Sequence, residues 1–262
     1  MHYQIKQNLF SYGSNYPVAK QFYRHMHNEY EILYFIQGDV DYSIEGVMYH
    51  LRPRDLLIIR PRAFHYCYPL TSAKYERFVL NFTDDDLKPP IREFLKNAVS
   101  VFNVPENSIV DNLFQHFIAA EKSFSKEELE IYLTSLVDNI VLFLKHTPVT
   151  EEKSIPGKKN SSFATILRYI DENPTEDITA ARLSEIFFVS KSWIMHSFRE
   201  RLGVGFSQYV NRKRILFAQT MLKKGESPSA VAEKCSFESY STFYRHYKNV
   251  LGHSPKADVP KD

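Results

Sequence analysis

The segments SKSWIMHSFRERLG (residues 190–203) and SYSTFYRHYKNVLG (residues 239–252) are two copies of one pattern, and they decide the fold of this chain. Each begins with serine, carries an apolar residue four positions later and ends with Leu-Gly. Serine is a preferred helix N-cap, glycine commonly ends a helix, and apolar residues at this spacing share one face. The repeat therefore predicts two capped helices, as in two DNA-reading helix-turn-helix units.

The residues before the first copy predict the partner helix of a helix-turn-helix unit. Thr179 can cap a helix over residues 180–186. We expect Ile186 to pack this helix against Ile194 and Phe198 of the first copy. The first unit would then consist of two helices joined by a tight turn.

A second helical pair and a connecting helix complete the C-terminal region. Ser227 or Ser229 can start a short helix that ends at Lys234, and residues 205–224 read as one long helix between the units. A rigid helix there would hold the two reading helices at the spacing of adjacent major grooves, about 34 Å. We expect residues 163–262 to form an all-α DNA-binding domain.

The composition is that of a globular protein with about two domains. The chain has 262 residues, of which 44% are hydrophobic and 24% charged, and its net charge of +2 does not by itself indicate a nucleic-acid partner. Cys67 and Cys235 are too few for a disulfide framework or a zinc module. No secretory signal pattern and no apolar run near the ~20 residues that span a bilayer is present. We expect a cytoplasmic protein without a membrane partner.

The N-terminal part of the chain has a different pattern. Across residues 1–105, short apolar runs rich in aromatic residues alternate with turn-forming pieces and predict an all-β sandwich or barrel. Residues 106–146 carry apolar residues at helical spacing and predict two successive helices. This pair could cover the core of the β-domain or form a dimer interface, and the pattern leaves both open. Residues 147–162 are polar and contain two prolines, as is typical of a linker.

Specific residues of the C-terminal region identify a resemblance. They are Tyr209, Arg214, Ala218 and Leu222 in the connecting helix and, further on, Phe237-Glu238-Ser239, Phe243-Tyr244-Arg245, Tyr247-Lys248 and Gly252-His253-Ser254-Pro255. With these residues the chain resembles the AraC/XylS family of bacterial transcription regulators. Two positions depart from the family pattern: Ser236 replaces a turn glycine, and Lys256-Ala257-Asp258 replaces an aromatic-arginine pair.

The resemblance implies which side chains face DNA. The base-facing positions fall on Ser192, Met195 and His196 in the first copy and on Tyr240, Ser241, Tyr244 and Arg245 in the second. An arginine can bind guanine through two hydrogen bonds, and a histidine can donate one to a purine. Lys191, Arg199 and Lys248 fit phosphate contacts, which position a protein on DNA without reading sequence. Trp193 fits a place in the core beside Ile194.

The N-terminal domain resembles the cupin superfamily. His25, His27, Glu31 and Gly38 match its first motif, and residues 54–65, which end in a histidine, resemble the second. In metal-binding cupins the matching His and Glu residues ligate one ion. Here Arg54, Arg60 and Arg62 stand in the second motif, and guanidinium groups near a metal cation would be unfavourable. We therefore expect a jelly-roll barrel with no metal and no cofactor.

The two resemblances together imply a DNA-binding regulator controlled by a small-molecule effector, typically a sugar. The expected ligand-binding residues are Tyr23, Arg24, His25, His27, Glu31, Tyr34, Arg60, Arg62 and His65. The expected partners are double-stranded DNA, a second copy of the chain and, if the protein is an activator, RNA polymerase. Two alternatives remain: a metal-dependent cupin enzyme with an accessory helical domain, and a DNA-binding protein whose β-domain is only a dimerisation scaffold. No catalytic residues are predicted.

Overall fold

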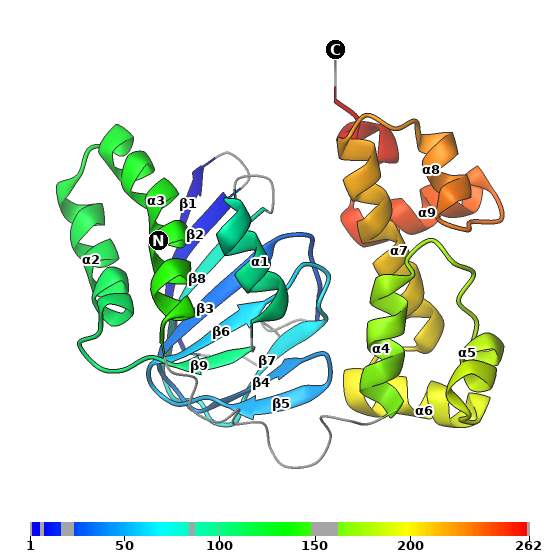
Figure 1. The fold of residues 1–262 in the computed structure, drawn as a ribbon, viewed down its shortest axis with the longest axis horizontal. Helices are drawn as coiled ribbons and strands as arrows, with labels where there is room; N and C mark the ends of the chain where they lie inside the picture. The colour runs from blue at the N-terminus through cyan, green and yellow to red at the C-terminus, as the bar shows by residue number, and fades with distance from the viewer. Residues whose placement is uncertain are drawn as a thin grey trace. The chain divides into compact units, whose positions relative to one another are not determined.

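The computed structural model describes residues 2–5, 8–16, 24–83, 87–98, 100–147 and 162–260. The chain divides into two units, residues 1–156 and 157–262 (Figure 1). Most of the predicted linker lies outside the described residues, so its boundaries stay a prediction. Within the described ranges, no helix is long and apolar enough to cross a membrane.

Two antiparallel sheets form the body of the N-terminal unit. The six-stranded sheet has the order β1 (His2–Ile5), β2 (Asn8–Asn15), β8 (Tyr75–Phe82), β3 (Tyr30–Gln37), β6 (Asp55–Ile59), β9 (Val101–Asn103). The three-stranded sheet has the order β5 (Val47–His50), β4 (Val40–Ile44), β7 (His65–Pro69). This arrangement confirms the predicted all-β cupin-like domain.

The alternation of side chains along β3 divides the unit into two cores. Leu33 and Phe35 lie in a cluster with residues of the smaller sheet, such as Tyr42 and Cys67. The neighbouring residues of β3, including Ile32, point to the opposite face and pack with the helices. Both faces of the six-stranded sheet are therefore buried, as the continuous burial of β3 requires.

Three helices accompany the larger sheet (Figure 1): α1 (Pro89–Asn97), α2 (Ile109–Ser123) and α3 (Lys126–Lys145). The helices α2 and α3 match the predicted pair, and buried apolar residues of both pack on the outer face of the sheet. The expectation that residues 1–105 contain only strands was wrong, because α1 lies within them. Two prolines at its start suit a helix N-terminus, and Ile91 and Leu95 bury one face.

The C-terminal unit is all-α, as predicted. Its helices are α4 (Ser162–Glu172), α5 (Ala180–Phe187), α6 (Lys191–Leu202), α7 (Phe206–Lys223), α8 (Pro228–Lys234) and α9 (Tyr240–Leu251). In four of them the N-cap side chain accepts the backbone N–H three residues on: Thr179 before α5, Ser190 before α6, Ser227 before α8 and Ser239 before α9. Both copies of the repeat are thus capped helices that end at a glycine.

One packing expectation in the first helix-turn-helix unit was wrong. Ile186 is 40% exposed, whereas Leu183 is the fully buried apolar residue of α5, as Ile194 and Phe198 are of α6. The pattern misled because α5 is short, and Ile186 lies only one residue before its end, where the chain already turns away.

The two departures from the family pattern have structural consequences. Ser236 adopts the left-handed conformation, with φ 55°, which is the backbone that a turn glycine would take. After α9, a 3-10 helix spans Pro255–Asp258. The Tyr247 hydroxyl donates to Asp258 at 2.5 Å, and the Gln219 amide donates to it at 3.2 Å. The replaced segment therefore still packs against α7 and α9.

Candidate nucleic-acid interface and ligand site

The helix α6 places its predicted base-facing residues in solvent. Ser192, Met195 and His196 are exposed, whereas Ile194 and Phe198 are fully buried on the other face. The His196 imidazole lies 3.7 Å from Glu200, one turn further along the helix. One side of α6 thus packs into the core, and the side chains on the other side are exposed to solvent.

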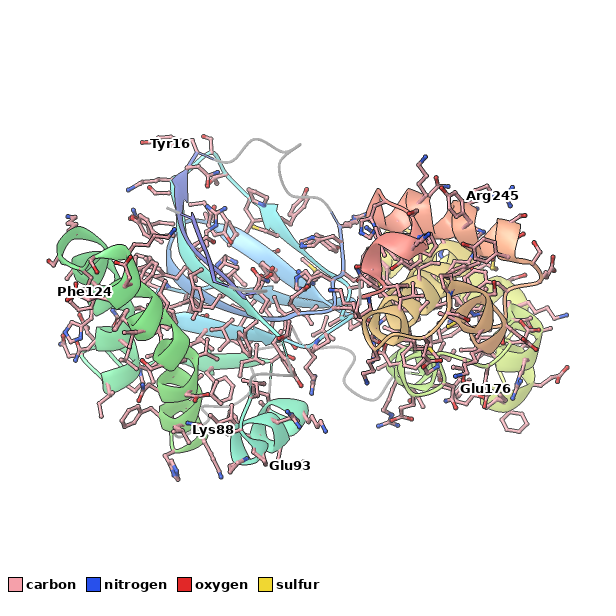
Figure 2. All side chains as sticks on the ribbon, turned by 90° about the horizontal axis from the view of Figure 1, so that it is seen from above. Tyr16, Lys88, Glu93, Phe124, Glu176 and Arg245 are labelled. Carbon is pink, nitrogen blue, oxygen red and sulfur yellow. The ribbon has the colours of Figure 1, made fainter. Side chains whose placement is uncertain are left out.

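The helix α9 repeats this division. Tyr240, Ser241, Tyr244 and Arg245 are all exposed, and the rings of Tyr240 and Tyr244 lie 6.3 Å apart. Arg245 projects from the helix (Figure 2) and makes no ion pair within the described part of the chain. An exposed guanidinium can contact base edges through hydrogen bonds, and exposed aromatic rings on the same helix can offer apolar surface to them.

The predicted phosphate contacts Lys191, Arg199 and Lys248 are exposed at the ends of the same two helices. Trp193, by contrast, is half-buried and stands edge-on to Phe163, with ring centroids 6.5 Å apart. This placement agrees with its expected role in the core.

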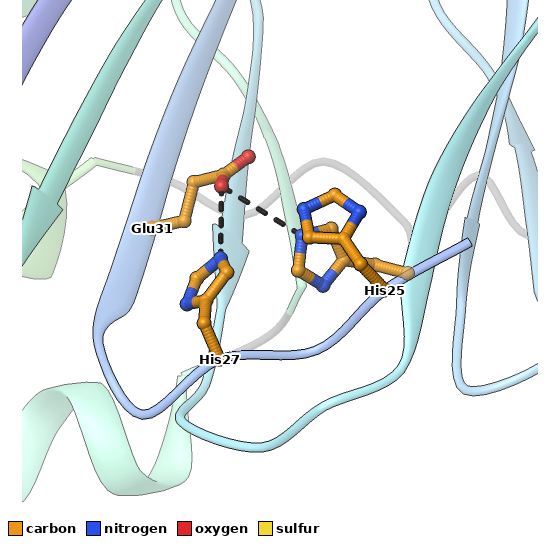
Figure 3. Close-up of side chains that lie close together, drawn as sticks. His25, His27 and Glu31 are labelled. Atoms are coloured by element: carbon orange, nitrogen blue, oxygen red, sulfur yellow. Dashed lines mark hydrogen bonds and ion pairs between the residues drawn. The ribbon is translucent and has the colours of Figure 1, made fainter. Parts of the chain in front are cut away.

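A second site lies inside the N-terminal barrel. His25, His27, Glu31 and His65 each offer one ligand atom, and these atoms lie within 4.8 Å of one another (Figure 3). His25 and His65 are directly opposite each other in an antiparallel bridge, with backbone N–H to carbonyl distances of 3.1 and 2.9 Å. Directly opposite residues point their side chains to the same face, which explains why residues 40 positions apart meet.

The carboxylate of Glu31 is the centre of this cluster. It lies 3.2 Å from Nε2 of His27 and 3.7 Å from Nε2 of His65. Burial alone would raise the pKa of Glu31, but the two imidazoles hold it well below its usual range. Burial would also lower the pKa of His27, whereas the hydrogen bond and the charge of Glu31 raise it.

Two further side chains that donate hydrogen bonds to Glu31 were not predicted from the sequence. The Tyr42 hydroxyl donates to Oε1 at 3.2 Å, and the Asn81 amide donates to Oε2 at 3.1 Å. They come from β4 and β8, on either side of the barrel interior. No spacing in the sequence relates them to Glu31, because strand register in the folded sheets brings them together.

The two histidines that face Glu31 are oriented by backbone carbonyl groups. Nδ1 of His65 lies 2.9 Å from the Ala63 carbonyl, and Nδ1 of His27 lies 3.1 Å from the Glu29 carbonyl. With the proton on Nδ1 held in this way, loss of the Nε2 proton that faces Glu31 would leave the Nε2 lone pair of each ring directed at the cluster. This arrangement is usual for metal-binding histidines. Nε2 of His65 is buried and has no hydrogen bond among the described residues.

The arginines of the second cupin-like motif mostly point elsewhere. Arg54 pairs with Glu106 at 3.6 Å, and Arg60 donates to the Lys96 carbonyl at 3.0 Å. Arg54 and Arg62 adopt φ 70° and 63°, so they keep the left-handed backbone that glycine favours. The electrostatic argument against a metal therefore does not apply to Arg54 and Arg60, since their guanidinium groups have other partners.

Other predicted ligand residues are not brought to the cluster. Tyr34 lies on the opposite face of β3 from Glu31, where its hydroxyl donates to Asp111 at 2.6 Å and its ring stacks on Phe114. Tyr34 therefore does not belong to the cluster around Glu31, because side chains alternate along a strand, and its contact with a ligand stays a prediction. Arg24 is exposed and lies over the ring of Tyr66. Tyr23 lies outside the described residues.

Comparisons with known proteins agree with the two domains. A family described as an AraC-like ligand binding domain matches residues 10–137, and one described as a helix-turn-helix domain matches residues 183–258. The HTH-type transcriptional regulator YbfI of Bacillus subtilis is 22% identical over 229 residues, which are 86% of this chain and 82% of YbfI. The matches give no support to the alternative of a cupin enzyme.

Two further similarities cover different shares of the chain. The probable transcriptional regulator LumQ of Photobacterium leiognathi is 33% identical over 88 residues, which are 33% of this chain and 36% of LumQ. A solved structure of ToxT from Vibrio cholerae, 15% identical, covers 95% of this chain and 97% of its own, with a TM-score of 0.41. The chain belongs to the AraC/XylS family of transcription regulators, with a cupin-like ligand-binding domain followed by a helix-turn-helix domain.

Proposed function

We propose that a small molecule bound in the N-terminal barrel controls how tightly α6 and α9 bind specific DNA sequences. The observation that carries this proposal is the repeated reading helix: one face is fully buried, and the other presents different side chains in each copy. Two such helices would read two short boxes in adjacent major grooves. Because Arg245 belongs only to the second copy, the two boxes would differ in sequence.

Selection of bound duplexes from a random DNA pool tests this proposal. We expect a half-site of two boxes about one helical turn apart, with an affinity that falls steeply as salt increases. The selection is run with the full chain, with and without a panel of sugars. Failure to enrich any sequence would contradict the DNA-reading role. Equal enrichment with every sugar would contradict the control by a sugar.

The barrel cluster supports the effector part of the proposal. Imidazole, carboxylate, amide and hydroxyl groups converge there, and these groups can bind the hydroxyls of a sugar. An effector changes DNA affinity only if it binds two states of the protein unequally. Calorimetric titration of the sugar panel, with Glu31→Gln as the variant and Glu93→Gln as the exposed control, measures the binding directly.

A second copy of the chain fits the outer face of α3. Ile131, Leu142 and Phe143 are 73%, 45% and 39% exposed, although the opposite side of the helix is buried in the core. Apolar side chains left in solvent on one helix suit a partner helix. Sedimentation should give a dimer, and Ile131→Glu with Leu142→Glu should give a monomer with the same circular dichroism. Such a regulator would act in the cytoplasm and, if it activates, contact RNA polymerase.

The orientation of the barrel histidines favours a second candidate for the effector site, a divalent transition-metal ion. His25, His27, Glu31 and His65 would hold the ion, since ligand atoms within 4.8 Å need only a small contraction to the roughly 3.4 Å of a tetrahedral zinc site. Imidazole-rich sites suit Zn, Cu, Fe or Ni ions. The ion would supply a Lewis-acidic centre for the oxygen atoms of an effector.

Metal analysis separates the two candidates. The untagged protein is titrated calorimetrically with Zn²⁺, Ni²⁺ and Fe²⁺, and its metal content is measured after dialysis. One ion per chain that is lost in His65→Ala but kept in His50→Ala would support the metal site. His50 is a suitable control because it is half exposed on β5 and pairs with Asp41 at 3.0 Å. Equal binding by both variants would exclude the site.

A further inference from the structure

In the turn of the second helix-turn-helix unit, Ser236 combines an unfavourable backbone conformation with a long-range hydrogen bond. Ser236 has φ 55°, a region that residues with a Cβ rarely adopt. Its hydroxyl donates to the Thr175 carbonyl at 2.5 Å, within the normal range for such a bond. The two residues are 61 positions apart. A strained residue with a long-range partner is a sign of a functional constraint.

The partner of Ser236 lies at the entrance to the first helix-turn-helix unit. Thr175 is in the connection between α4 and α5, four residues before the N-cap Thr179. The hydrogen bond therefore joins the turn of the second unit directly to the loop that leads into the first unit. It does not pass through α7, the helix that links the two units along the chain.

The same loop is also held by α7. The Lys213 ammonium donates to Asp171 at 2.6 Å, and Arg214 donates to the Glu176 carbonyl at 2.8 Å. Both basic side chains are buried, and because Asp171 belongs to α4 and Glu176 to the loop, the two contacts fix the end of α4 and the loop on the middle of α7. Beyond α7, however, the chain passes through Gly225, whose φ of 91° is open only to glycine. The second unit packs on α7 through its own buried core, and the Ser236 hydroxyl adds a direct contact with the loop of the first unit that this packing does not include.

We propose that Ser236 is a positioning residue that fixes the orientation of the second reading helix relative to the first. The hydroxyl bridge to Thr175 closes a ring with α7 and thereby sets the spacing between the two DNA boxes that the protein accepts. This inference rests on the proposed function. It concerns the spacer between the boxes, whereas the exposed side chains of α6 and α9 would choose the bases.

Three substitutions distinguish the effect of the Ser236 hydroxyl from the effect of the left-handed backbone conformation. Ser236→Gly removes the bridge and accepts the left-handed backbone without strain. Ser236→Ala removes the bridge and keeps the strain. Ser236→Asn tolerates the left-handed conformation and brings an amide N–H that can donate to the Thr175 carbonyl. Ser229→Ala, at an exposed serine of α8, is the matched control.

The experiment measures fluorescence anisotropy on the duplex recovered by selection and on two duplexes whose spacer is one base pair shorter or longer. One base pair rotates the second box by about a tenth of a turn. We expect the wild type, Ser229→Ala and Ser236→Asn to lose about tenfold in affinity on the altered spacers, because protein or DNA must deform. Ser236→Gly and Ser236→Ala should lose less than about threefold.

Two results would overturn the inference. One is a spacer profile of Ser236→Gly that equals the wild type, and the other is a wild type that binds all three spacers equally well. A wild type that selects no DNA sequence would instead overturn the proposed function and, with it, the inference. Thermal melts by circular dichroism establish that each variant is folded, which we expect above all for Ser236→Gly because it relieves strain.

Discussion

The two helix-turn-helix units share their caps and their buried aromatic residue but turn the chain differently. In the first, the left-handed residue is Phe188, two positions before the cap Ser190. In the second, it is Ser236, three positions before the cap Ser239. As a result Phe188 is 94% exposed, whereas Phe237 is half-buried, with its ring 5.3 Å from that of Phe243. A shared helical pattern therefore leaves the turn free to vary.

The largest expected effect tests what the two units share. Phe198 and Tyr247 hold the same position in the two copies, are both fully buried, and each meets an aromatic ring 5.1 or 5.4 Å away. Phe198→Ala and Tyr247→Ala should each lower the free energy of unfolding by about 3–5 kcal/mol, because a large cavity replaces each ring. Urea denaturation measures this loss. A much smaller loss in one unit would mean that the two cores are not equivalent.

The next effect tests where the units differ on the DNA-facing side. Arg245→Ala should weaken binding to the selected duplex by about 1–3 kcal/mol and relax the preference for one base. His196→Ala should cost about 1 kcal/mol, because an imidazole makes a single hydrogen bond where a guanidinium makes two. Binding is measured on duplexes with each base pair substituted in turn. Equal losses on every duplex would assign both residues to phosphate contacts.

The N-caps provide an effect that should be equal in the two units. Ser190→Ala and Ser239→Ala each remove a side-chain acceptor of one backbone N–H at the start of a reading helix. Each substitution should destabilise the protein by about 1 kcal/mol. Ser192→Ala, at the exposed second residue of α6, is the control for stability. If Ser192→Ala destabilised the chain as much as Ser190→Ala, the caps would not explain the repeat.

The smallest effect tests the turn of the first unit. Phe188→Asn should raise the free energy of unfolding by about 0.5 kcal/mol, because asparagine tolerates a left-handed backbone better than phenylalanine. Phe188→Ala keeps the unfavourable conformation, so its free energy of unfolding should stay within about 0.5 kcal/mol of the wild-type value. Thermal and urea unfolding give both values. A clear destabilisation by either variant would show that the exposed ring makes stabilising contacts.

Whether a feature of this chain could be predicted depends on how far apart in the sequence its interacting residues lie. The caps Thr179, Ser190 and Ser239 act within three residues, so their pattern is visible in the sequence. The helix α1 was missed because its nine residues follow a run of strands and carry few apolar positions. Ile186 was misplaced because spacing along the helix does not show which side of its last turn faces α6; that depends on how the two helices pack.

The barrel site illustrates the same limit. His25, His27, Glu31 and His65 were recognised as a motif, and the structure places them together. Tyr34 was expected among the ligand residues because its ring and hydroxyl suit a sugar, yet it lies on the other face of β3 from Glu31. The direction of the arginine side chains and the contacts of Tyr42 and Asn81 with Glu31 depend on partners elsewhere in the fold.

The two repeated helices, their caps and the order of a β-domain followed by a helical domain could be read from the residues alone, because capping and periodicity are local properties of the chain. The side chains around Glu31, the cover on the outer face of the sheet and the left-handed turns depend on how distant elements pack together. The bond from Ser236 to Thr175 joins residues 61 positions apart. Such contacts arise when packed elements meet, so no local pattern encodes them.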